Sequence, residues 1–148
     1  MRIELLKKSE VSDGSQFFEF LPGKYDGKCW KEESVYLEEL VMGFFEGVVK
    51  RVLPSYSHFA FQYLDAPATR TLAEDLKGIG TAIQEAREPK VYIQSLADQN
   101  DSVHPDMNPF LSEGSEQAGL KLASLAKQLA EWLETEAVKY GGVSILGL

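Results

Sequence analysis

Residues 57–83 read SHFAFQYLDAPATRTLAEDLKGIGTAI, a stretch that joins a predicted strand to a predicted helix. Within residues 57–64, aromatic side chains occupy alternate positions from Phe59 to Tyr63, which is the period of a strand. Asp65 stands where a helix N-cap is expected, ahead of a run with apolar residues every three or four positions. An aromatic strand followed directly by an amphipathic helix indicates a fold in which helices pack on a sheet.

The segment upstream, residues 31–53, has the apolar spacing of one helical face. The apolar positions are Leu37, Leu40, Val41, Phe44, Phe45, Val48, Val49 and Val52. Gly43 and Gly47 lie four residues apart inside this predicted helix, which predicts the close approach of another backbone. Two glutamate pairs, at residues 32–33 and 38–39, are interpreted as the hydrated polar face of the same helix.

The other segments complete a layered fold. Strands are expected at residues 2–7, 17–21, 91–96 and 143–148, and further helices are expected after Asp65 and over about residues 115–140. Residues 100–115 are predicted to form a long polar loop. The chain is therefore expected to be an α/β or α+β sandwich, with a mixed sheet of about four to five strands and three amphipathic helices.

Size and composition limit the class of protein. The 148 residues suit a single globular domain, 1–148. The single cysteine, Cys29, cannot form an internal disulfide, so a reducing compartment is expected. The first ten residues lack the apolar core of a signal peptide, and no apolar run approaches the roughly 18 residues of a membrane span. We therefore expect a cytoplasmic protein.

The formal net charge of −8 disfavours several classes of partner. Nucleic acids and anionic membranes attract basic surfaces, so neither is expected to bind this chain. The long-range attraction is instead toward a positively charged protein. The sequence does not decide the oligomeric state.

No catalytic signature accompanies the potential nucleophiles and bases. Cys29, His58 and His104 could form a cysteine–histidine pair, but no flanking motif supports one, and all three are interpreted as structural residues. The glycines at residues 78–80 lack the third glycine of a dinucleotide fingerprint, and the chain has no Walker lysine and no G-x-S-x-G elbow. We assign no catalytic residue and no cofactor, and a non-enzymatic role is favoured.

The segment from Asp98 to His104 loosely matches a calcium-binding loop. An EF-hand loop places glycine at position six and glutamate at position twelve, whereas this chain has Val103 and Pro109 there. The match fails, so no metal ligand is assigned.

The acidic residues are unevenly distributed along the chain. Residues 91–120 contain five carboxylates and neither lysine nor arginine, while residues 121–148 balance three acids with three bases. An apolar anchor among steering charges is typical of a protein–protein hot spot, although such acids can also serve only solubility. The predicted partner-binding residues are Asp98, Asp101, Asp106, Phe110, Glu113 and Glu116.

In its size, its charge, its acidic segment 91–120 and its α/β layout, the chain resembles bacterial toxin-immunity proteins, which neutralise secreted or contact-delivered toxins. The resemblance implies an inhibitory binding protein whose acidic loop covers the cationic active site of a nuclease-like toxin. Inhibition would then combine steric occlusion with electrostatic steering, which gives fast association that weakens with salt.

Two other classes of function remain open. A small enzyme or an accessory subunit would need a pocket around His58, His104, Cys29 and Asp65. A regulatory homo-oligomer would expose more apolar area than one domain requires, and the first half of the chain holds 12 of the 16 aromatic residues.

Overall fold

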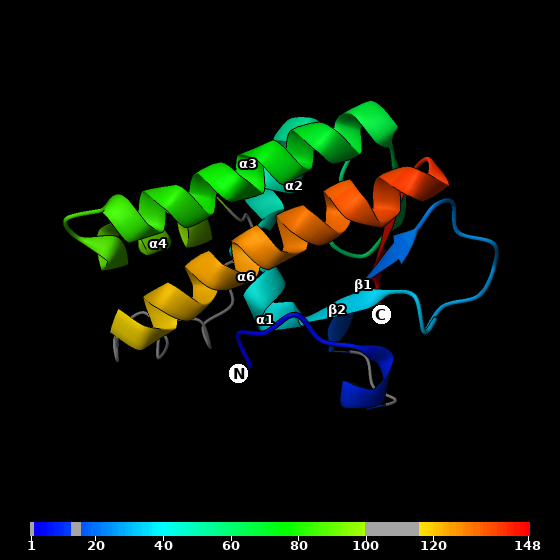
Figure 1. Ribbon diagram of the computed structural model, residues 1–148, viewed down its shortest axis with the longest axis horizontal. Helices are drawn as coiled ribbons and strands as arrows, with labels where there is room; N and C mark the ends of the chain where they lie inside the picture. The colour runs from blue at the N-terminus through cyan, green and yellow to red at the C-terminus, as the bar shows by residue number, and fades with distance from the viewer. Residues whose placement is uncertain (1, 13–15, 100–115) are drawn as a thin grey trace.

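The computed structural model describes residues 2–12, 16–99 and 116–148 (Figure 1). The strands are β1 (Phe17–Pro22), β2 (Val35–Glu38), β3 (Phe61–Asp65) and β4 (Gly142–Gly147). The helices are α1 (Glu39–Met42), α2 (Glu46–Val52), α3 (Ala66–Glu85), α4 (Pro89–Asp98) and α6 (Glu116–Thr135), with two short 3-10 turns, η1 (Lys8–Glu10) and η2 (Ala137–Tyr140). The expected fold class is confirmed as α+β.

The four strands form one sheet in the order β2-β1-β4-β3, and every neighbouring pair is antiparallel. The sequence predicted a mixed sheet, and that detail is wrong, because all neighbouring strands are antiparallel. Phe20 lies near its centre, where it pairs with Val35 of β2 on one side and with Ile145 of β4 on the other. An antiparallel sheet suits this chain, because no helix has to cross over between β1 and β2.

Helices cover one face of the sheet. Figure 1 shows α3 and α6 side by side and running in opposite directions, with the sheet near one end of the pair and α4 near the other. Phe18 and Phe20 of β1 join the apolar residues of these helices in the main core. The opposite face buries a smaller cluster of Leu6, Phe17 and Tyr36. Both faces of β1 are therefore covered.

The predicted helix at residues 31–53 is wrong over its first third. Residues Val35–Glu38 form β2, and the remainder divides into α1 and α2 around a turn at residues 43–45. Val35, Tyr36 and Leu37 are completely buried, because both faces of this part of the sheet are covered. A strand buried on both faces loses the alternation of polar and apolar residues that identifies strands in a sequence.

The glycines of this segment were expected to allow another backbone to approach. A Cβ at Gly47 would lie 2.7 Å from side-chain atoms of Gln99, the residue that follows α4. Gly47 therefore makes room for the side chain of Gln99, and not for another backbone as the sequence predicted.

The predicted strand at residues 91–96 is also wrong, because Pro89–Asp98 form the helix α4. The buried residues of α4 are Ile93, Leu96 and Ala97, a spacing of three and four. Pro89 occupies the first turn of α4, where a missing N–H costs nothing. The predicted strand at residues 2–7 is reduced to one bridge, in which Leu6 and Tyr36 exchange hydrogen bonds of 3.0 and 2.9 Å.

Other predicted elements are confirmed. The carboxylate of Asp65 caps α3 by accepting from the backbone N–H of Ala68 at 2.9 Å. The strands predicted at residues 17–21 and 143–148 are β1 and β4, and α6 lies within the predicted third helix. The aromatic strand begins at Phe61, four residues later than expected. In the described part of the chain, none of the helices combines the length and apolar character needed to cross a lipid bilayer.

Two glycines of α3 give a matched test of how closely α3 packs on α6. A Cβ at Gly78 would meet nothing within 4 Å. A Cβ at Gly80 would lie 2.9 Å from Cγ of Lys127 and 3.0 Å from the carbonyl oxygen of Ala123. We expect Gly78→Ala to raise the free energy of unfolding by about 0.5–1 kcal/mol, because alanine is the better helix former.

Gly80→Ala is expected to lower the free energy of unfolding by about 1–3 kcal/mol, because the added methyl group overpacks the contact with α6. Urea denaturation of the two variants and the parent protein measures both changes. Equal stabilisation by the two alanines would contradict the close contact at Gly80.

Candidate functional site

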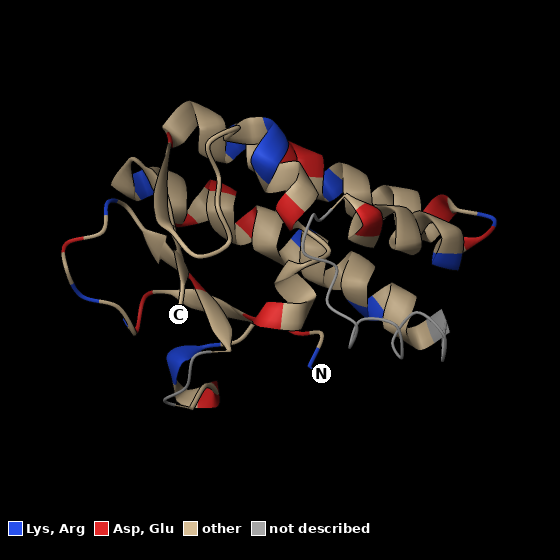
Figure 2. Cartoon of the chain, turned by 180° about the vertical axis from the view of Figure 1, so that it is seen from behind, with Lys and Arg blue, Asp and Glu red and all other residues tan. Residues whose placement is uncertain are grey.

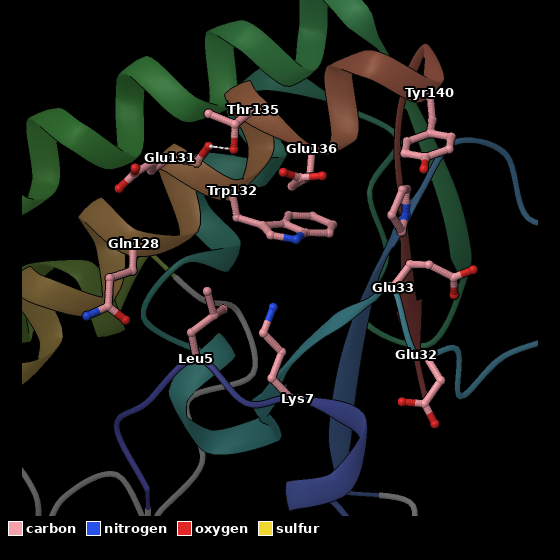
Figure 3. Close-up of a pocket in the computed structure, with 11 residues that line it drawn as sticks. Leu5, Lys7, Glu32, Glu33, Gln128, Glu131, Trp132, Thr135, Glu136 and Tyr140 are labelled. Atoms are coloured by element: carbon pink, nitrogen blue, oxygen red, sulfur yellow. Dashed lines mark hydrogen bonds between the residues drawn. The ribbon is translucent and has the colours of Figure 1, made fainter.

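An open cleft of about 590 Å³ lies between α6, the N-terminal segment and the connection between β1 and β2 (Figure 3). Its volume is within the usual range for ligand sites. The lining residues are Leu5, Lys7, Pro22, Glu32, Glu33, Gln128, Glu131, Trp132, Thr135, Glu136 and Tyr140. Four of these residues carry carboxylates and one carries an ammonium group, so we name the site the acidic cleft.

The buried carboxylate of Glu19 positions one wall of the acidic cleft. Glu19 is completely buried on β1, and its two oxygens accept four hydrogen bonds. The donors are the backbone N–H groups of Trp30 and Lys31 at 2.7 and 3.0 Å and the hydroxyls of Ser34 and Tyr36 at 2.7 and 3.2 Å. A buried charge is stable only when such donors replace its lost water. The segment that carries Glu32 and Glu33 is thereby tied to the sheet.

Further contacts stabilise the same segment. Trp30 has a positive φ of 60° and stacks on Tyr36 with 5.7 Å between ring centroids. Lys31 forms an ion pair of 2.6 Å with Asp26. The hydrogen bond from Lys31 lowers the pKa of Asp26, and the same bond raises the pKa of Lys31. The basic neighbour of Glu32 therefore already has an acidic partner.

The last turns of α6 and the turn η2 supply the opposite wall. One side of α6 faces the cleft with Glu131, Trp132 and Thr135, which all lie within about one turn of the helix. Glu136 is the first residue after the helix. Trp132 is 7% exposed, while Glu131 and Glu136 are exposed to solvent. Glu136 has a weak ion pair of 3.7 Å with Lys139. In Figure 3 the Trp132 ring extends from α6 into the cleft.

The arrangement favours a cationic ligand. Four solvent-facing carboxylates drawn from two distant parts of the chain share one concave surface with a single lysine. Such a concave surface concentrates negative potential and attracts ammonium or guanidinium groups. Within the described residues, no group of three or more His, Cys, Asp or Glu side chains is arranged to hold a metal ion.

Two of the six predicted partner-binding residues lie in the described part of the chain. Asp98 is exposed at the end of α4, where it accepts a hydrogen bond of 2.8 Å from the side chain of Gln94. Glu116 is the first residue of α6. Four predicted residues lie outside the described residues: Asp101, Asp106, Phe110 and Glu113. His104, the last residue of the segment compared with a calcium-binding loop, also lies outside them.

Sequence reasoning missed the acidic cleft. Glu32 and Glu33 were interpreted as the polar face of a helix that does not begin there, since β2 follows them. Glu131 and Glu136 belong to a segment whose acids and bases balance. The available signal was Trp132, a large aromatic residue between these acids, but periodicity alone assigns such a residue to the core.

The residues proposed for a small enzyme do not form a nucleophile–base pair in the described part of the chain. His58 Nδ1 contacts Oε1 of Glu46, and His58 Nε2 lies 2.9 Å from Oε1 of Glu39. Both ring nitrogens are therefore engaged by carboxylates, and neither is available to deprotonate Cys29. Asp65 serves as the N-cap of α3.

The His58 cluster joins α1, α2 and the segment before β3. Glu46 is 4% exposed and also accepts a hydrogen bond of 2.8 Å from the hydroxyl of Tyr56. Burial lowers the pKa of His58, but the hydrogen bond to Glu39 and the charge of Glu46 outweigh that effect, so the pKa is raised. Burial also raises the pKa of Tyr56. An ionised carboxylate facing each His58 nitrogen favours the imidazolium form, in which both nitrogens donate.

The raised pKa of His58 predicts how stability changes with pH. A group with a higher pKa in the folded chain stabilises the fold fully below its unfolded pKa of about 6.5, and that contribution is lost as pH rises through the folded pKa. We expect His58→Gln to lower the free energy of unfolding by about 1–2 kcal/mol below that pH, and by progressively less as the pH rises.

Urea denaturation of both proteins across this pH range measures the difference. Glu39→Gln removes one of the two carboxylates and should lower the His58 pKa in an NMR titration of the imidazole. A stability difference that does not change with pH would show that His58 is not charged in the folded protein.

Comparison of the chain with protein-family models, with curated proteins and with solved structures finds no match. Its function is therefore inferred from the acidic cleft and from the charge of the chain.

Proposed function

We propose that this chain is a protein-binding inhibitory module of the toxin-immunity type, which holds a basic partner protein at the acidic cleft. One observation carries the proposal: the carboxylates of Glu32, Glu33, Glu131 and Glu136 share one concave surface with a single lysine. The chain as a whole has a net charge of −8, so a basic partner is attracted before contact.

The proposed mechanism has two stages. Negative potential steers a cationic surface of the partner toward the cleft and accelerates association at low salt. A basic side chain then enters the cleft, and the surrounding protein covers the partner's active site. Inhibition follows because substrate is excluded, so no chemical step by this chain is required.

The helices carry charges of both signs along their length. In Figure 2, acidic and basic residues are interspersed along them. Mixed charges of this kind give solubility without a strong local field. Asp98 and the other acids predicted at residues 91–120 remain part of the proposal, as a further source of negative charge.

Neutralising the cleft tests this function. The triple variant Glu32→Gln, Glu33→Gln, Glu136→Gln removes three charges from the cleft, while the control Glu74→Gln, Glu85→Gln, Glu88→Gln removes three exposed charges from α3 and the residues after it. Each protein is used as bait in an extract of the native host at low and high salt. We expect the parent and the control to retain a basic protein and the cleft variant to bind it at least about tenfold more weakly.

The captured protein is then purified and assayed for its activity, or for toxicity in cells, with and without one equivalent of each variant. Inhibition by the parent and by the control, but not by the cleft variant, supports the proposal. Capture of no basic protein, or equal inhibition by all three forms, would contradict it.

A further inference from the structure

We infer that the acidic cleft recognises an extended peptide segment that carries arginine, and that Trp132 and Lys7 donate hydrogen bonds to a main-chain carbonyl oxygen of that segment. This inference rests on the proposed function and specifies the chemistry of the partner. It assigns a role to the two hydrogen-bond donors of a cleft that is otherwise acidic.

The first observation concerns the indole N–H of Trp132. The side chain is 7% exposed and lines the cleft, and no hydrogen bond between described residues involves its nitrogen. No buried polar side-chain atom in the described part of the chain lacks a partner, so this N–H must reach the space of the cleft. The rest of the ring is buried, so this N–H is the one polar point that Trp132 presents to the cleft. Here the partner has to come from a ligand or from solvent.

The second observation concerns the neighbouring ammonium group. In Figure 3, Nζ of Lys7 points toward the indole nitrogen of Trp132. Among the described residues, Lys7 Nζ takes part in no ion pair, although four carboxylates line the same cleft. The backbone N–H of Lys7 donates to Oε2 of Glu10 at 2.8 Å, which fixes the start of the side chain. Two donors from distant segments therefore line the same cleft.

A ligand that displaces water from these two donors has to offer an acceptor oxygen, and the charge of the cleft selects its type. A free carboxylate would be repelled by Glu32, Glu33, Glu131 and Glu136. A carbonyl oxygen is neutral and accepts from both donors without that repulsion. Main-chain carbonyls recur along any extended peptide, so the acceptor and a basic side chain can belong to the same ligand.

The walls of the cleft favour arginine over lysine. Glu33 and Glu136 flank the region near the Trp132 ring, and Tyr140 lies beyond it (Figure 3). A guanidinium group binds a carboxylate through two parallel hydrogen bonds and stacks on aromatic rings. An ammonium group is attracted to an aromatic face but lacks the planar pair of donors, so the same peptide with lysine is expected to bind more weakly.

An NMR titration tests the inference on the whole chain. The protein has two tryptophans, so its ¹⁵N-labelled form gives two indole signals, and Trp30→Phe identifies that of Trp132. The probes are the blocked peptides acetyl-Gly-Arg-Gly-amide, acetyl-Gly-Lys-Gly-amide and acetyl-Gly-Gln-Gly-amide, together with guanidinium ion alone. We expect the arginine peptide to shift the Trp132 indole proton downfield and to bind more tightly than the lysine and glutamine peptides.

Variants separate the two parts of the site. Trp132→Phe and Lys7→Met each remove one donor and should weaken the arginine peptide by about three- to tenfold, the effect of one hydrogen bond. Because Lys7 is exposed, Lys7→Met keeps the test decisive if Trp132→Phe reduces folding. Guanidinium ion alone should shift the Trp132 indole proton less than the arginine peptide does, because it supplies no carbonyl oxygen. Equal affinity for the arginine and glutamine peptides overturns the inference, as does an indole signal that does not move at saturation.

The two proposals fail in distinguishable ways. If a basic protein is captured through the cleft carboxylates but Trp132→Phe and Lys7→Met leave its affinity unchanged, the carbonyl contact is wrong and the inhibitory function stands. If the arginine peptide shifts the indole signal but no basic protein is captured or inhibited, the cleft is a peptide site and the inhibitory function is wrong.

Discussion

The carboxylate of Glu19 is completely buried in the sheet and accepts four hydrogen bonds, three of them from residues 30–34. A charge in that position is tolerated only while every donor remains in place. The bonds that satisfy Glu19 therefore also fix the path of the chain between β1 and β2. Glu32 and Glu33 lie between two of these donors, so their position in the acidic cleft depends on a residue outside the cleft.

Tyr36 couples this interaction to the N-terminal wall of the cleft. Its hydroxyl is shared between Glu19 at 3.2 Å and the backbone oxygen of Lys31 at 2.7 Å, while its backbone forms the bridge with Leu6. The side chains on either side of Leu6, Leu5 and Lys7, both line the cleft. One buried network thus positions the acids of the β1–β2 connection and the ammonium group that faces Trp132. The long pairing of α3 with α6 independently fixes the third wall.

The sequence predictions were correct where the decisive interactions lie close together in the chain. The helix capped by Asp65 was predicted because its N-cap and its amphipathic period are both local properties. Residues 35–38 were misassigned because both faces of the sheet are covered there, which removes the alternating pattern. Residues 91–96 were misassigned because a short apolar run suits either a strand or a helix.

By itself, the sequence determined that the chain builds helices on a sheet and where α3 and α6 lie. Those properties depend on composition and on contacts within about one helical turn. Only the tertiary structure brought Lys7, Glu33, Trp132 and Glu136 onto one concave surface. The reason is physical: periodicity records which face of an element is buried, and carries no information about which exposed faces of distant elements converge.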